Sequence, residues 1–303
     1  MKKVFVFPGQ GAQSVGMGNG FSVSGRIWKR ADEIMGWKLS EVVMTGPEES
    51  LALTKVTQPA VYVTEIIILE ELKAMGFVPE AAAGHSLGEY AAVAASGALS
   101  WEDGLELVKF RGELFEETGA NHPGGMLAVI GLEEEQINGI AAELDGVCQV
   151  VNYNSPGQLV VSAEKRLLKT AAEKMNAAGA RMVIPLKVSG GFHSSLMDDA
   201  VEPMRAKVES LNFSDPGVAF YSNSAGRAVK TADEIKDCLA RQVNSPVRWI
   251  DIINNIRTDL GEEILFIEAG PGKVLQGLLR RIDRKNSVKG VSEPGDLAGL
   301  PSN

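Results

Sequence analysis

Apolar residues along the chain fall into short runs and longer periodic stretches. Short runs bounded by turn residues, such as Lys3–Phe7 and Ala81–Gly84, predict buried strands. Longer stretches with an apolar face, such as Pro59–Met75 and Trp101–Glu117, predict helices. Because strands alternate with helices, we expect an α/β fold with a mainly parallel sheet covered on both faces.

The order of predicted strands and helices changes between residues 124 and 189. The apolar pattern there predicts the strands Met126–Ile130, Val147–Tyr153, Gln158–Ser162 and Met182–Lys187, with helices at Glu133–Leu144 and Lys165–Ala178. The order βαββαβ is that of a ferredoxin-like unit. We therefore expect a small domain at 124–189, inserted into a large domain formed by 1–123 and 190–303.

The part of the chain after this insertion returns to alternating elements. Its pattern predicts strands at Val218–Tyr221 and Ile264–Glu268 and helices at Val201–Leu211, Ala232–Val243 and Val247–Thr258. A further helix is expected after the Gly270-Pro271-Gly272 turn, reaching about Arg284. The last residues, Gly295–Asn303, have the composition of a loose tail.

Composition narrows the class of protein. Hydrophobic residues make up 45% and charged residues 23% of the 303 positions, which is ordinary for a globular protein. The net charge of −9 argues against a general nucleic-acid binder. Two cysteines 90 residues apart, Cys148 and Cys238, exclude a disulfide framework and a zinc cluster. The most apolar stretch, Val61–Met75, contains three glutamates, so we expect a cytoplasmic protein without a membrane segment.

Residues Gly84-His85-Ser86-Leu87-Gly88 form a G-x-S-x-G motif between a predicted strand and a predicted helix. This motif is typical of a nucleophile elbow, in which the serine occupies a strained turn and the glycines leave room on both sides. We expect the helix to begin at Ser86, so that its free N–H groups lie near a developing oxyanion. The alternative is an ordinary glycine-rich turn.

A nucleophilic serine needs a base, and the chain has three histidines. His85 adjoins Ser86 and is expected to brace the elbow, because consecutive side chains at a sharp turn point apart. His122 lies in a predicted linker, where an exposed loop histidine is the simpler interpretation. His193 follows Gly190-Gly191-Phe192 at a strand-to-helix junction, and elimination favours it as the base.

Two further features leave alternatives open. Arg111 falls on the inward side of its predicted helix, where its planar fork could hold a carboxylate. Its spacing alone favours a salt bridge to Glu113 or Glu116, or an exposed position. The loop Phe7–Gln13 resembles a dinucleotide fingerprint, but Ser14 stands where a glycine is needed. A loop that donates N–H groups to an oxyanion is the remaining interpretation.

Eight motifs in order resemble the malonyl-CoA:acyl carrier protein transacylase family. They are FPGQGAQ (7–13), TQPA (57–60), GHSLGEY (84–90), SGALSWEDGLELVKFRGELF (96–115), NSPGQ (154–158), GFHSSLM (191–197), SPVRW (245–249) and EAGPGKVL (268–275). The resemblance covers the chain from Met1 to about Val291. It implies a hydrolase-like large domain with an inserted ferredoxin-like small domain.

The resemblance also implies a ping-pong acyl transfer and a role for each matching residue. Ser86 would attack the malonyl thioester, His193 would take its proton, and Arg111 would hold the free malonyl carboxylate. A backbone carbonyl near the position of Gln242 would orient the histidine, so no third carboxylate is expected. The remaining matches are Gln10 and Leu87, whose N–H groups would form the oxyanion hole, and Gln58, Asn152 and Asn154, which would lie near the acyl pocket.

Phe192 matches the pattern of malonyl-selective members of this family. A bulky residue there would crowd a 2-methyl substituent on the acyl group. Since one methyl group discriminates by only ~1–3 kcal/mol, we expect incomplete selectivity.

The implied partners are malonyl-CoA and acyl carrier protein, with no cofactor or metal, because the coenzyme A thioester is a substrate. We expect a monomer that binds neither nucleic acid nor membranes. Three other functions stay open: a thioesterase or esterase with the same elbow, a nucleotide-binding module that uses the Phe7–Gln13 loop, and an acyltransferase of polyketide synthesis.

Overall fold

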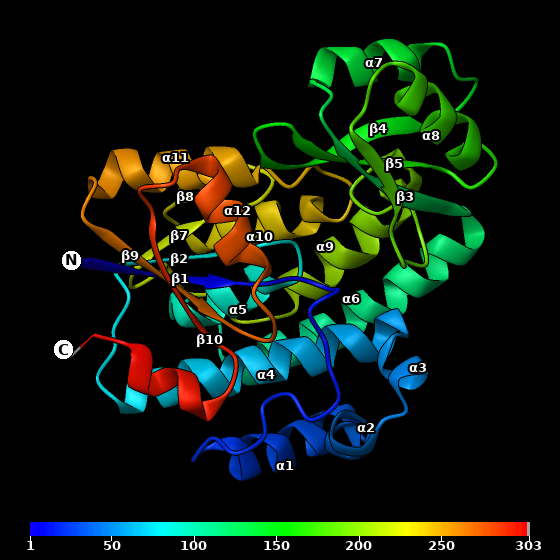
Figure 1. Ribbon diagram of the computed structural model, residues 1–303. Coiled ribbons are helices and arrows are strands. Elements are labelled where there is room, and N and C mark those ends of the chain that lie inside the picture. The colour runs from blue at the N-terminus through cyan, green and yellow to red at the C-terminus, as the bar shows by residue number, and fades with distance from the viewer. Residues whose placement is uncertain (302–303) are drawn as a thin grey trace.

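The computed structural model of the protein describes residues 1–301 and has two lobes of unequal size (Figure 1). The larger lobe is built around a six-stranded sheet with the order β10-β9-β1-β2-β7-β8. All pairs in this sheet are parallel except β7 with β8. The strands are β1 (Lys2–Phe7), β2 (Ala81–Gly84), β7 (Ala219–Tyr221), β8 (Ala228–Val229), β9 (Ile264–Ala269) and β10 (Ser287–Val291).

Strand β1 shows why this sheet is covered on both faces. Val4 and Val6 pack with residues of α11 (Trp249–Leu260) and α12 (Val274–Ile282). Phe5 and Phe7 pack on the opposite face, in the cluster that includes α4 (Thr54–Ala74), α5 (Gly88–Ala95) and α6 (Trp101–Asn121). All four side chains are fully buried, so the continuous apolar run serves two cores.

The other helical segments of the larger lobe complete these layers (Figure 1). They are α1 (Ser24–Met35), α2 (Leu39–Thr45), α3 (Glu48–Leu51), α9 (Val201–Glu209) and α10 (Ala232–Gln242), with 3₁₀ helices η1 (Ser195–Ala200) and η2 (Pro294–Gly299).

The smaller lobe is an antiparallel four-stranded sheet in the order β4-β5-β3-β6, with two helices packed on one face. Its elements are β3 (Gly124–Ile130), α7 (Glu134–Ala142), β4 (Cys148–Ser155), β5 (Gln158–Glu164), α8 (Leu168–Ala177) and β6 (Met182–Pro185). This βαββαβ order and strand arrangement are those of a ferredoxin-like unit. The boundaries 124 and 189 stay a prediction.

Strand β4 also reaches the larger lobe. The backbone N–H of Tyr153 donates to the carbonyl of Val247 at 3.0 Å, and the N–H of Val247 donates to the carbonyl of Val151 at 2.8 Å. The end of β4 is thereby fixed beside the residues that precede α11. This contact places Asn152 and Asn154 at the junction of the two lobes.

Two predictions about elements differ most clearly from the structure. Helix α4 begins at Thr54, five residues before the predicted start, because Pro59 lies inside the helix rather than at its first turn. The predicted loose tail begins at Gly295, but residues 295–299 belong to η2 (Pro294–Gly299). There the Asp296 carboxylate accepts from the N–H groups of Ser292 and Glu293. Ser302 and Asn303 lie outside the described residues.

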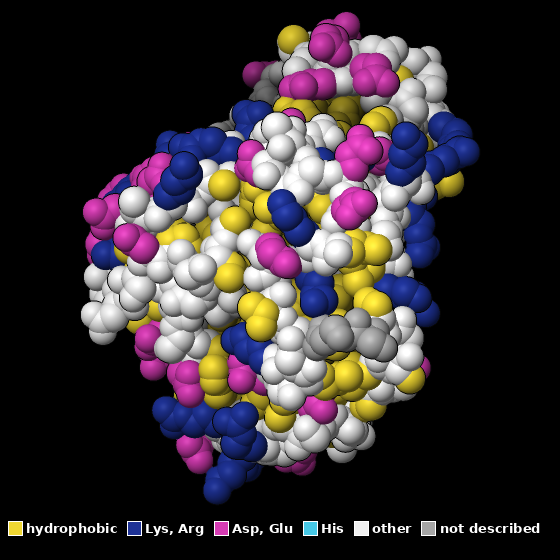
Figure 2. Space-filling view, turned by 90° about the vertical axis from the view of Figure 1, so that its left-hand side faces the viewer, with side chains coloured by type: hydrophobic (Ala, Val, Ile, Leu, Met, Phe, Trp, Pro, Cys, Tyr) yellow, Lys and Arg dark blue, Asp and Glu magenta, His cyan; other side chains and the backbone are white. Residues whose placement is uncertain are grey.

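The surface view gives no sign of a strongly charged face. Figure 2 shows Lys and Arg side chains interspersed with Asp and Glu over the face that it presents. Within residues 1–301, no helix is both long and apolar enough to cross a membrane.

Candidate active site

The G-x-S-x-G motif forms a tight strand–turn–helix at the carboxyl end of β2. Ser86 has a φ of 52°, a conformation that is strained for a residue other than glycine. A Cβ on Gly84 would lie 1.9 Å from the carbonyl carbon of Gly88, and a Cβ on Gly88 would lie 2.1 Å from the carbonyl oxygen of Phe7. Only glycine therefore fits at either position. Helix α5 begins at Gly88, so the prediction that it starts at Ser86 is two residues too early.

Asn223 clamps this turn, and sequence analysis missed it. Its Oδ1 accepts from the N–H of Ser86 at 2.7 Å, and its Nδ2 donates to the carbonyl of Gly84 at 2.6 Å. Asn223 lies just after β7, the strand that pairs with β2. A polar residue at the carboxyl end of a neighbouring parallel strand was the available signal.

His193 lies against the serine. Its Nε2 is 2.7 Å from Ser86 Oγ, and its Nδ1 is 2.8 Å from the backbone carbonyl oxygen of Gln242. A carbonyl can only accept, so Nδ1 carries the proton and Nε2 accepts from the serine hydroxyl. A backbone carbonyl, not a carboxylate, thus occupies the third position of the relay.

The surroundings of His193 keep its ring neutral. Burial and, to a lesser extent, the Arg111 cation lower the pKa of His193 to about 3. Because the folded pKa is depressed for a basic group, the ring is in its proton-accepting form at every pH well above 3. The free protein therefore holds a base that is ready to act.

This pKa predicts the pH profile of serine reactivity. The rate at which a neutral fluorophosphonate labels Ser86 should show no histidine limb between pH 5 and pH 8, where a histidine of ordinary pKa would lose activity about tenfold per unit below ~6.5. Labelling rates across that range check this expectation. A limb centred near pH 6.5 that disappears in His193→Ala would contradict it.

Arg111 is buried beside the nucleophile with a relative exposure of 1%. Its Nη1 donates to Gln58 Oε1 at 2.7 Å, and its Nη2 donates to Ser86 Oγ at 3.2 Å. Its Nε and Nη2 donate to Gln242 Oε1 at 3.2 and 2.9 Å, and its guanidinium lies over the Phe115 ring. These partners are neutral, so the cation can still pair with a ligand carboxylate.

The spacing-based interpretation of Arg111 is wrong. Arg111 is neither exposed nor paired with Glu113 or Glu116, and Glu116 instead faces Lys55 at 3.4 Å. The inward-facing position on the helix was predicted, but its partners lie on distant segments. Gln58 is 53 residues away in sequence and Gln242 is 131 residues away.

The predicted oxyanion hole consists of two backbone N–H groups. Neither the N–H of Gln10 nor that of Leu87 donates to an acceptor in the described part of the chain. The loop that carries Gln10 presses on the elbow, since a Cβ on Gly9 would lie 2.7 Å from the His85 carbonyl oxygen. The roles of both groups stay predictions.

One cleft brings most of the predicted site residues together. Its lining consists of Gln10, Gln58, His85, Ser86, Arg111, Phe115, Met126, Asn152, Leu186, Val188, Phe192 and His193. The Phe192 ring packs on the Phe115 ring, with centroids 4.7 Å apart. Asn152 is buried, and its Oδ1 has no hydrogen-bond partner among the described residues. Asn154 lines a second groove that shares part of this wall.

The other two histidines have structural partners. His85 Nε2 lies 2.7 Å from Asn154 Oδ1, so His85 links the elbow to β4. His122 follows α6 directly, and its Nε2 lies 2.7 Å from Asp199 Oδ2. The prediction of an exposed loop histidine is confirmed for His122, whose side chain is 42% exposed, and Asp199 is its partner.

The fold, the site and the relatives of the chain agree on one class of enzyme. A parallel α/β sheet with a serine–histidine pair at the end of a strand is typical of enzymes that transfer or hydrolyse acyl groups. The family model described as acyl transferase domain matches residues 4–293. The chain therefore belongs to the acyl transferase family.

The relatives are similar over almost the whole chain. It is 38% identical over 301 residues to the malonyl CoA-acyl carrier protein transacylase of Bacillus subtilis, covering 97% of this chain and 94% of that one. A solved acyl carrier protein S-malonyltransferase from Vibrio cholerae has 35% identity and a TM-score of 0.93, covering 99% and 100% of the two chains. A solved malonyl-transacylase in complex with its type II polyketide synthase acyl-carrier protein has 33% identity and a TM-score of 0.94, covering 98% of each.

Proposed function

We propose that the protein transfers a malonyl group from malonyl-CoA to the phosphopantetheine thiol of an acyl carrier protein, for fatty acid synthesis. The observation that carries this proposal is the buried Arg111 guanidinium, 3.2 Å from Ser86 Oγ and held only by neutral acceptors. An acyl group whose far end is a carboxylate can pair directly with this guanidinium. The names of the relatives support the same substrate and partner.

The first half-reaction forms a malonyl-serine ester. Ser86 Oγ attacks the thioester carbon while its proton passes to Nε2 of His193, which the Gln242 carbonyl holds in the correct tautomer. The N–H groups of Gln10 and Leu87 stabilise the oxyanion. When the intermediate collapses, the C–S bond breaks and the imidazolium returns the proton to the coenzyme A thiolate.

The second half-reaction reverses these steps with another thiol. His193 takes the proton of the phosphopantetheine thiol, whose sulfur attacks the ester carbon. The C–O bond then breaks, and Ser86 recovers its proton from His193. The malonyl carboxylate remains on Arg111 throughout, so that one clamp serves both half-reactions.

A polyketide carrier is the second candidate partner, because one similar solved structure is a complex with a type II polyketide carrier protein. The chemistry is the same with either carrier. A thioesterase or esterase would release the acyl group to water and has no use for the Arg111 clamp. A cytoplasmic location, a monomeric state and independence of cofactors stay predictions.

Transfer to matched carrier proteins tests the proposal. With malonyl-CoA as donor, a holo fatty-acid carrier protein should gain one malonyl group, whereas its apo form, which lacks the thiol, should gain none. A holo polyketide carrier in parallel separates the two candidate partners. Release of free malonate at the same rate with and without the holo carrier would favour the hydrolase instead.

A further inference from the structure

Glu89 is a buried carboxylate that is linked through Gln242 to Arg111, the proposed clamp for the malonyl carboxylate. It is the second residue of α5 and is fully buried. Its Oε1 accepts from the N–H of Asn223 at 2.9 Å, and its Oε2 accepts from Gln242 Nε2 at 2.6 Å. Burial raises the pKa of Glu89 to about 7, while these hydrogen bonds and the Arg111 charge oppose the rise. Glu89 lies in none of the steps described above.

The amide of Gln242 separates this carboxylate from Arg111. Its nitrogen donates to Glu89 Oε2 and to the carbonyl oxygen of Ser86, the latter at 2.8 Å. Its oxygen accepts two guanidinium N–H groups. A reversed amide would place its NH₂ against the guanidinium donors and its oxygen against two acceptors. The carboxylate thus favours the one orientation that presents an oxygen to Arg111.

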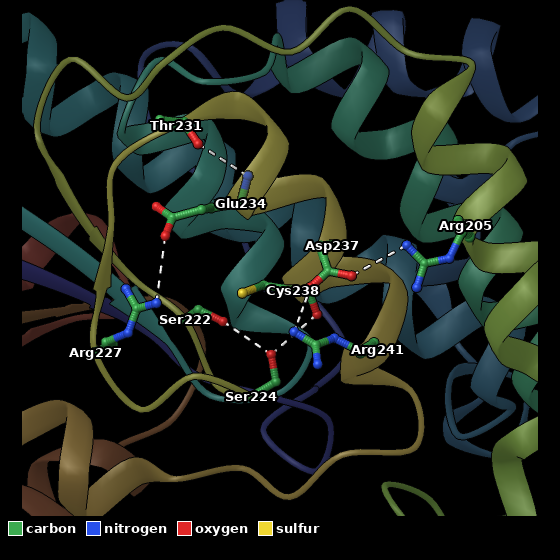
Figure 3. Close-up of polar contacts among 9 residues, drawn as sticks. All are labelled: Arg205, Ser222, Ser224, Arg227, Thr231, Glu234, Asp237, Cys238 and Arg241. Carbon is green, nitrogen blue, oxygen red and sulfur yellow. Dashed lines mark hydrogen bonds and ion pairs between the residues drawn. The ribbon is translucent and has the colours of Figure 1, made fainter.

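Hydrogen bonds join the two segments that carry the partners of Glu89, the residues after β7 and helix α10. Figure 3 shows Ser224, next to Asn223, within hydrogen-bond distance of Ser222, and its hydroxyl donates to the carbonyl of Cys238 in α10 at 3.3 Å. Figure 3 also shows Asp237 of α10 in contact with Arg205 and Arg241. Helix α10 ends at Gln242, so this network fixes the backbone from which the amide projects.

The arrangement also balances charge without blocking the clamp. A direct Glu89–Arg111 ion pair would occupy the guanidinium that a ligand carboxylate needs. Because the Gln242 amide lies between them, the Glu89 carboxylate interacts electrostatically with the Arg111 cation without direct contact. Nη2 of Arg111 therefore stays beside Ser86 Oγ. The Gln242 amide thus gives the guanidinium a polar partner and leaves the side that lines the cleft open to a ligand.

We propose that Glu89 is a positioning residue for the Arg111 clamp, because it holds the Gln242 amide in the orientation that presents its oxygen to the guanidinium. This inference rests on the proposed malonyl transfer. It assigns Glu89 an effect on acyl donors that carry a carboxylate and little effect on neutral donors.

The Glu89→Gln variant tests this role with little change of shape. An amide has one acceptor oxygen, whereas the Glu89 carboxylate accepts from the N–H of Asn223, from Gln242 Nε2 and from the Ser222 side chain. The backbone N–H of Asn223 cannot turn away, whereas the Gln242 amide can, so Gln242 loses its charged acceptor and keeps the Ser86 carbonyl as the acceptor for its NH₂ group. At pH 8.5, above the pKa of about 7 of Glu89, we expect the KM for malonyl-CoA to rise about tenfold or more while that for acetyl-CoA changes less than about threefold, since one charge-assisted hydrogen bond is lost.

Two comparisons make the test specific. Glu106→Gln removes an exposed carboxylate from α6, the helix of Arg111, and should leave both KM values unchanged. Gln242→Met removes the amide but keeps the backbone carbonyl. It should reproduce the malonyl-specific rise, and adding Glu89→Gln to it should raise the malonyl KM no further. Gln242→Met also decides the question if Glu89→Gln does not fold.

Other outcomes would overturn the inference. Equal losses with malonyl-CoA and acetyl-CoA, or a fall in kcat with unchanged KM, would show that Glu89 only supports the elbow. Unchanged KM values in Glu89→Gln and Gln242→Met would show that it has no role. Failure of the proposed function has a different signature, since wild-type protein would then gain no malonyl mass at all, and both proposals would fall.

Discussion

Replacing Arg111 with alanine should lower kcat/KM for malonyl loading by about 30- to 5,000-fold. The guanidinium is buried, and loss of one partner from a buried, hydrogen-bonded charge pair costs about 2–5 kcal/mol. An acetyl group has no carboxylate to pair, so acetyl loading should change much less. The expected result is therefore a shift of preference towards neutral acyl groups, measured as the ratio of kcat/KM values for malonyl-CoA and acetyl-CoA.

Two matched variants accompany this measurement. Arg30→Ala removes a surface arginine that pairs with Glu33 on α1 and should leave the ratio unchanged. Arg111→Lys keeps the charge but loses the planar fork that Gln58 and Gln242 hold, so it should recover only part of the malonyl activity. Wild-type malonyl loading in Arg111→Ala would remove the basis of the substrate assignment.

Replacing Ser86 with alanine should abolish the covalent acyl adduct and lower transfer by about 10⁴-fold or more. Ser86 Oγ supplies the ester oxygen. Because the serine and its base act together, loss of the nucleophile removes nearly all of the rate enhancement that the pair provides. The fold should tolerate the change, since alanine is smaller and the glycines of the turn remain. Intact mass after mixing with malonyl-CoA measures the adduct directly.

The control for this variant is Ser195→Ala, an exposed serine two residues from His193. It should load malonyl as the wild type does. If Ser86→Ala still gained the mass of a malonyl group, another residue would be the nucleophile, and the role of the elbow would have to be abandoned.

The elbow was predictable because its geometry depends on local sequence. Gly84 and Gly88 are required within five consecutive residues, and both glycines are visible in the motif. His193 could be found because the chain offers only three histidines. In both cases the chemistry leaves few choices, and the fold only has to bring the groups together.

The supporting residues were not predictable in this way. Asn223 lies 137 residues from Ser86, and Glu89 contacts a residue 153 positions away in Gln242. Such contacts depend on the order of strands in the sheet, which the sequence pattern does not specify. Glu89 also lies on a short helix that is buried all round, so no exposed or inward face distinguishes it.

Two elements near the C-terminus, β10 and η2, were not predicted, for other reasons. Strand β10 is short and contains the exposed Lys289, as suits an edge strand, so its apolar signal is weak. The segment Pro294–Gly299 has the composition of a loop, yet Leu297 and Leu300 pack against the core. Tertiary contacts thus order a segment that local propensity leaves open.

The central claim is that Ser86 carries the malonyl group between the two thiols. The most direct test isolates wild-type protein after brief mixing with malonyl-CoA and then adds a holo acyl carrier protein in a single turnover, with both masses followed. We expect the protein first to gain one malonyl group and then to lose it as the carrier gains it, while the loaded protein alone keeps the group far longer. A carrier that is loaded with no detectable malonyl-protein at any time, or a malonyl-protein that loses its group equally fast to water, would rule out Ser86 as the carrier of the malonyl group between the two thiols.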